Sequence, residues 1–153
     1  MVTTPTELNI PTTLYDLDYC LWVERTIQLL REGKFSDVDI PNLLEELDDM
    51  SGSQRDALES NLAIILMHLL KYAYQKERRS NSWRYTLVEH RQRIERAFRR
   101  SPSLKRYYQE VFEDCYKNAR QLAAAETGLE ISVFPEICPF TQEQALSTGF
   151  LPE

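Results

Sequence analysis

One stretch, residues 58–98, constrains the fold of this chain more than any other. Its first arm, LESNLAIILMHLLKYAYQ at 58–75, carries apolar residues on almost every helical face. The turn KERRSNS follows, and the second arm, WRYTLVEHRQRIERAF at 83–98, has a single apolar stripe. A helix that is apolar on all sides belongs in the middle of a soluble domain. We therefore predict that 58–75 forms a central helix and that the other segments cover it.

The residues before the central helix also recur at helical spacing. We predict a first helix that has Asp16 as its N-cap and ends at Arg31, followed by a short helix over 39–50. Ser53 is then the expected cap of the central helix. Gly52 leaves two alternatives open, since it can either separate the short helix from the central one or lie at a kink inside one longer helix.

The residues after the central helix contain further start and stop signals. Ser80 or Ser82 can cap a fourth helix, and the pair Ser101-Pro102 predicts the start of a fifth. Gly128 is the expected stop of that fifth helix.

The last residues and the first ones differ from the helical middle. The tail ISVFPEICPF is apolar but broken by prolines, so we expect it to lie extended across the helices. Thr141 with Gln144 predicts a capping box for a short last helix.

The fold class we predict is all-α: a helical bundle of about five main helices, a short C-terminal helix and an extended tail. We expect an arm over 1–13 and a single domain over 14–153, a length at which one core suffices.

Cysteine usage and hydropathy indicate a compartment. The three cysteines, Cys20, Cys115 and Cys138, are widely spaced and form no Cys-x-x-Cys pair, as is typical of a reducing environment. The first residues lack the features of a signal peptide. The uncharged stretch Ser60–Leu70 is far shorter than the roughly 20 residues that span a bilayer. We predict a cytoplasmic protein without membrane contact.

The central sequence also resembles a known family. The stretch HLLKYAYQKERRSNSWRYTLVEHR at 68–91 is similar to a bacterial family catalogued as domain of unknown function 29. The opening LYDLDYCLWVERTIQLLREGKFSDVDIPNLLEELDDM, SPSL at 101–104 and the ending CPFTQEQALSTGFLP are similar too, so the resemblance covers about residues 14–152. It implies a compact all-helical protein and implies no activity. Lys76 departs from the proline expected there, which affects only the local turn.

A line of polar residues is the first candidate site. His68, Lys71 and Gln75 share one stripe of the apolar central helix, which predicts a small polar binding site, a solvated edge of the helix or a satisfied buried network. His90 lies within the apolar stripe of the fourth helix, and there we expect a core histidine rather than a ligand.

The arginine turn is the second candidate. Arg78, Arg79 and Arg84 flank a predicted helix N-terminus together with Ser80 and Ser82, and such an end attracts anions. The turn can therefore bind phosphate. The anion can also come from the chain itself, and we favour an internal pairing with an acidic counterpart: Glu45, Glu46, Asp48 and Asp49. Arg78 and Arg79 can alternatively cap the end of the central helix.

The catalytic motifs that we sought have no match in this sequence. The four carboxylates at 45–49 lack the Glu-x-x-His pairs of di-iron bundles, and no His-Glu-x-x-His, Gly-rich phosphate loop or Gly-x-Ser-x-Gly occurs. We predict no catalytic residues, no metal site and no cofactor.

Charge is distributed unevenly along the chain. Residues 71–106 carry 12 basic and 3 acidic side chains, a net charge of +9, whereas the whole chain has a net charge of −6. We favour a non-enzymatic protein-interaction or regulatory module that binds another protein or itself. The alternative is a phosphate- or nucleic-acid-binding protein that uses the basic turn and helix at 71–106. An enzyme that uses His68 is a third possibility.

Overall fold

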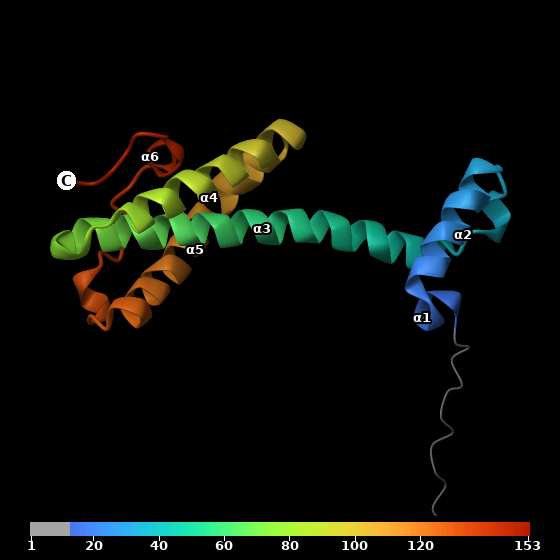
Figure 1. The fold of residues 1–153 in the computed structure, drawn as a ribbon, viewed down its shortest axis with the longest axis horizontal. Helices are drawn as coiled ribbons and strands as arrows, with labels where there is room; N and C mark the ends of the chain where they lie inside the picture. Colours follow the sequence, from blue (N-terminus) through green and yellow to red (C-terminus); the bar gives the residue numbers. More distant parts are fainter. Residues whose placement is uncertain (1–12) are drawn as a thin grey trace, which may run out of the picture. The chain divides into compact units, whose positions relative to one another are not determined.

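A computed structural model describes residues 13–153, and all its regular secondary structure within that range is helical. The predicted arm therefore lies outside the described residues, apart from Thr13. The α-helices are α1 (Leu14–Leu17), α2 (Tyr19–Arg31), α3 (Ile40–Tyr74), α4 (Asn81–Arg100), α5 (Leu104–Thr127) and α6 (Gln142–Leu146) (Figure 1). Three 3-10 turns connect them: η1 (Phe35–Asp37), η2 (Lys76–Arg78) and η3 (Ile131–Val133). The all-α fold class is confirmed.

The long helix α3 joins two helices that the sequence analysis treated as separable. It has 35 residues and runs through Gly52 without interruption, so the alternative of one longer helix holds. Ser53 lies inside α3, and its predicted role as an N-cap was wrong. A glycine costs a helix only about 1 kcal/mol, which the helix-forming residues around it can offset. As a result, the described chain has four helices longer than six residues rather than about five.

Two helix starts also differ from their predictions. Asp18, not Asp16, caps α2, because its carboxylate accepts a hydrogen bond from Leu21 N at 3.0 Å. Ser101 is the C-cap of α4 and not the N-cap of α5, because α5 begins only at Leu104.

Three other boundary signals are confirmed. Ser80 Oγ accepts a hydrogen bond from Trp83 N and so caps α4. Gly128 ends α5 with a φ of +72°, a left-handed conformation that glycine adopts without strain. Thr141 and Gln144 form the predicted capping box of α6.

The chain gathers into two compact units, the first ending at Met50 and the second covering Ser51–Glu153. The first unit contains α1, α2 and the first turns of α3. Few of its described side chains are fully buried: Trp22, Thr26 and Val38. Aromatic contacts supplement this small core, since the rings of Tyr15 and Trp22 meet edge to face with centroids 4.8 Å apart.

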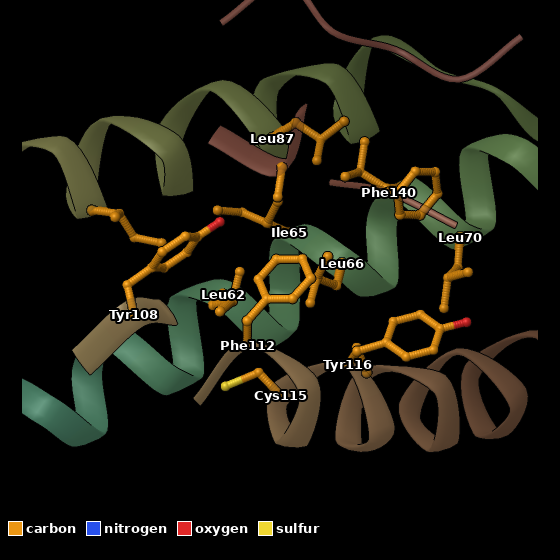
Figure 2. Packing of buried hydrophobic residues seen from close by; sticks show 14 of the residues in the cluster. Leu62, Ile65, Leu66, Leu70, Leu87, Tyr108, Phe112, Cys115, Tyr116 and Phe140 are labelled. Carbon is orange, nitrogen blue, oxygen red and sulfur yellow. The ribbon is translucent and has the colours of Figure 1, made fainter. Parts of the chain in front are cut away.

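The second unit has an extensive core, which forms around the later turns of α3 (Figure 2). This confirms the prediction that the stretch beginning at residue 58 is a buried central helix. Its fully buried side chains pack against α4, α5 and the C-terminal segment. The main contributors are Leu62, Ile65, Leu66, Leu69 and Leu70 from α3; Leu87 and Ile94 from α4; Phe112 and Tyr116 from α5; and Phe134, Phe140 and Ala145 from the C-terminal segment.

Side chains of α4 and α5 hold the C-terminal segment in place through its backbone carbonyls. Arg91 is buried, and its guanidinium donates from Nε to Ala145 O at 2.9 Å and from Nη2 to Phe150 O at 3.0 Å. Arg120 donates to Phe134 O, and the hydroxyls of Tyr108 and Tyr116 donate to carbonyls of the same segment. The predicted tail is thus part of the core and is fixed by polar contacts as well as apolar ones.

Candidate binding surfaces

The polar line of α3 lies in the second unit, and Lys71 is its most enclosed member. Lys71 is 5% exposed, its Nζ lies 2.9 Å from Glu126 Oε1, and the same nitrogen lies 4.5 Å from the ring centroid of Trp83. An ammonium group that is buried is stable only when such partners replace its water.

Both histidines donate a ring N–H to a backbone carbonyl of their own helix. His68 is half-buried, and its Nδ1 lies 2.9 Å from Ile64 O. Burial lowers the pKa of His68, and the positive charge of Lys71 adds to that effect. His90 is buried, with Nδ1 2.9 Å from Thr86 O, so the predicted core histidine is confirmed. Gln75 follows the end of α3 and its carbonyl accepts from Arg78 N.

Arg79 is the anchored member of the arginine turn. Its Nε donates to Tyr72 O at 2.8 Å, its Nη2 donates to Pro152 O at 3.3 Å, and its guanidinium carbon lies 4.2 Å from the ring centroid of Tyr72. The alternative in which Arg79 caps the end of the central helix is therefore confirmed for this residue. Arg84 donates to the Tyr72 hydroxyl at 3.3 Å, while Arg78 is exposed.

The two serines of the turn play different parts. Ser80 caps α4 with its hydroxyl, whereas Ser82 is exposed in the first turn and accepts from Thr86 through its backbone carbonyl. Whether this turn also binds an external anion stays a prediction.

The acidic counterpart lies on the part of α3 that belongs to the first unit. Glu46 accepts hydrogen bonds from the hydroxyls of Tyr15 at 2.6 Å and Tyr19 at 2.7 Å. These bonds stabilise the carboxylate and so lower the pKa of Glu46. Glu45, Asp48 and Asp49 are exposed. Among the residues that the structure describes, no ion pair joins this group to the arginine turn. The group lies near the start of the continuous helix α3, whereas Arg79 binds the Tyr72 carbonyl in its last turn. The predicted internal pairing was therefore wrong.

Arg91 is a structurally important residue that the sequence analysis did not single out. It lies four residues after Leu87 and three before Ile94, so the apolar stripe of α4 passes through it. That spacing is the signal that could have identified it, since a charged residue on a core-facing stripe must find buried partners.

A groove between α3 and α4 is the clearest basic cavity of the second unit. It has a volume of about 450 Å³, within the usual range of ligand sites. Three arginines of α4 line it, Arg93, Arg96 and Arg100, at i, i+3 and i+7. The basic block is visible in the sequence, but the groove is not, because it depends on the packing of two helices.

The first unit exposes apolar side chains. Ile40, Leu44 and Leu47 recur at i, i+4 and i+7 in the first turns of α3, and they are 47%, 56% and 52% exposed. Residues at these spacings are neighbours on a helix surface, so they form one stripe. We call it the α3 apolar stripe.

Other features of the surface are less distinctive. A cavity of about 390 Å³ is lined by Glu59, Asp114 and Cys115 among others, and one of about 210 Å³ lies between α4 and the C-terminal segment. Within residues 13–153 there is no cluster of three or more His, Cys, Asp or Glu side chains placed to hold a metal ion. None of the helices in that range is both long and apolar enough to cross a bilayer.

Comparison with known proteins defines the class of this helical chain. The family model described as "Domain of unknown function DUF29" matches residues 14–151, nearly the whole chain. The chain therefore belongs to the DUF29 family, as the central stretch of its sequence indicated. Searches of curated proteins and of solved structures give no match.

Proposed function

We propose that this DUF29 protein is a helical protein-interaction module and that the α3 apolar stripe is one of its contact surfaces. The observation that supports this most is the exposure of about half of each of three neighbouring side chains, Ile40, Leu44 and Leu47. Large exposed apolar patches on soluble proteins mark sites of protein contact. Acidic residues on the same helix, Asp48 and Asp49, supply the polar rim that such contacts have.

The small core of the first unit supports the same proposal. Only a few of its described side chains are buried, whereas its surface carries Leu17, Leu21, Phe35 and Met50 in addition to the stripe. A segment of this size buries too little surface to be stable alone, and association with a partner is a common remedy.

Nucleic-acid binding is the second candidate. It is favoured by the net charge of +9 on residues 71–106, which include the arginine turn and α4. Such binding weakens steeply as salt rises, because bound arginines release counterions from the phosphates.

We propose a location in the bacterial cytoplasm, a setting that free cysteines such as Cys20, Cys115 and Cys138 suit.

Affinity purification from the native host tests the interaction proposal. The full chain is compared with Leu44→Glu/Leu47→Glu and with a matched control, Leu122→Glu/Val133→Glu, which adds the same charge at exposed apolar positions of the second unit. We expect a discrete partner with wild type and with the control, and about a tenfold loss with the stripe variant. Identical recoveries from all three proteins would contradict the proposal.

A further inference from the structure

We propose that the groove between α3 and α4 binds an acidic amphipathic helix of another polypeptide. This inference rests on the proposed function as an interaction module, but it concerns the second unit and a surface separate from the α3 apolar stripe. Three features of the groove support this assignment: an apolar floor, a wall of arginines and the lack of aromatic side chains among the lining residues.

The floor of the groove is apolar. Leu58 and Ile94 lie at its base and are already almost fully buried by the chain itself. The apolar surface open to a ligand therefore comes from Ala57 of α3, which is exposed, and Ala97 of α4, which is half-buried. Because alanine is small, these two positions leave space between the helices that larger residues would fill. A helix that docks in such a groove inserts its apolar side chains into this kind of space.

The α4 wall of the groove is basic. Arg93, Arg96 and Arg100 lie within eight residues of α4, a rise of about 10 Å, which is roughly two turns of a docked helix. Arg93 pairs with Glu89 at 2.5 Å, whereas Arg96 and Arg100 have no ion-pair partner among the residues that the structure describes. The opposite wall offers the side-chain amides of Gln54 and Asn61, which can donate or accept hydrogen bonds.

This composition favours a carboxylate-bearing helix over nucleic acid. Arginine forms two parallel hydrogen bonds with a carboxylate as with a phosphate, so the arginines alone do not distinguish the two ligands, although arginine is also enriched in protein interfaces. Single-stranded nucleic acid needs aromatic side chains on which its bases can stack, and none of the residues that line the groove is aromatic. The ligand that fits both floor and wall therefore has leucine-like residues on one stripe and glutamates or aspartates beside it.

Fluorescence anisotropy with the full-length protein tests the assignment. The probe is a labelled synthetic helical peptide of about five turns, with a leucine stripe flanked by glutamates. A control peptide has glutamine in place of every glutamate, and a labelled single-stranded RNA is the third probe. We expect the glutamate peptide to bind at least about tenfold more tightly than the glutamine peptide, and more tightly than the RNA at the same ionic strength.

Variants locate the binding to the groove. Arg96→Gln/Arg100→Gln should weaken peptide binding about tenfold, whereas Arg99→Gln/Lys105→Gln, which removes the same charge outside the groove, should change it less than about twofold. Ala57→Leu fills the floor without changing the charge and should also weaken binding. Circular dichroism and melting confirm that each variant is folded.

Several outcomes would overturn the proposal. Equal losses in both charge variants would show general electrostatic attraction, and unchanged binding in Ala57→Leu would show that the floor is not used. Tighter binding of RNA, lost in Arg96→Gln/Arg100→Gln, would assign the groove to nucleic acid. Concentration-dependent dimers that the groove variants abolish would assign it to a second copy of this chain. In each case an intact stripe-dependent partner would leave the proposed function standing.

Discussion

At the scale of single residues, Arg79 connects the end of α3 to the end of the chain. Removing its guanidinium leaves Tyr72 O and Pro152 O without their donor. We expect Arg79→Ala to lower the free energy of unfolding by about 1–3 kcal/mol. Arg78→Ala, the exposed neighbour, is the matched control and should stay within about 0.5 kcal/mol of wild type. Urea unfolding measures both, and similar small effects would contradict a structural role for Arg79.

The same variant tests whether the arginine turn binds an external anion. If it does, phosphate should raise the melting temperature of wild type but not of Arg79→Ala. An equal rise in both proteins, or none in either, would contradict an anion site that uses Arg79.

His68 gives a prediction about pH. Burial lowers its pKa in the folded protein, whereas in the unfolded chain it titrates near the usual value of about 6.5. Between these two values the unfolded state binds more protons, so the free energy of unfolding falls as the pH drops below about 6.5. Melts between about pH 7.5 and pH 5.5 should show a smaller decrease for His68→Gln than for wild type. An equal decrease in both would show that His68 does not contribute.

At the scale of elements, α3 provides the stability of the second unit. Leu66 is fully buried in its core, so Leu66→Ala should cost about 2–5 kcal/mol of unfolding free energy. Leu44→Ala removes the same atoms from an exposed position of the same helix and should cost less than about 1 kcal/mol. Denaturant melts compare the two, and a loss below about 0.5 kcal/mol for Leu66→Ala would place this part of α3 outside the core.

Gly52 tests the continuity of α3. An added Cβ would meet no atom within 4 Å, and the backbone is helical there. Gly52→Ala should therefore stabilise the protein by about 0.5–1 kcal/mol. Gly128→Ala is the contrasting variant, since its φ of +72° strains any other residue by about 1–2 kcal/mol. Destabilisation by Gly52→Ala in thermal melts would mean that the helix breaks at this glycine.

The helices themselves were predictable because apolar spacing records which face is buried. The capping residues were harder, since Asp16 and Asp18 both precede a helical pattern. Asp16 lies inside the short helix α1, whereas Asp18 follows its end and caps α2. Ser53 carried a capping signal that the continuous α3 overrides. An N-cap residue contributes only about 1 kcal/mol to the stability of a helix. The flanking helix formers and the tertiary contacts therefore decide whether α3 continues through Ser53.

At the scale of the whole molecule, the candidate surfaces were only partly predictable. The arginine turn and the basic block are visible as charge in the sequence. The groove of Arg96 and Arg100 is not, because it depends on how residues of two helices, including Ala57 and Ala97, come to line one cavity. The role of Arg91 was hidden for a related reason, since its partners are backbone carbonyls more than 50 residues away.

Both proposed surfaces, the α3 apolar stripe and the α3–α4 groove, should contact other proteins in the cell. Photo-crosslinking in the native host tests this expectation most directly, with a photoreactive residue placed at Leu47, at Arg96 or at Tyr85, an exposed position of α4 that lines neither surface. We expect discrete protein adducts from Leu47 and Arg96 and only background from Tyr85. The same background from all three positions would contradict it.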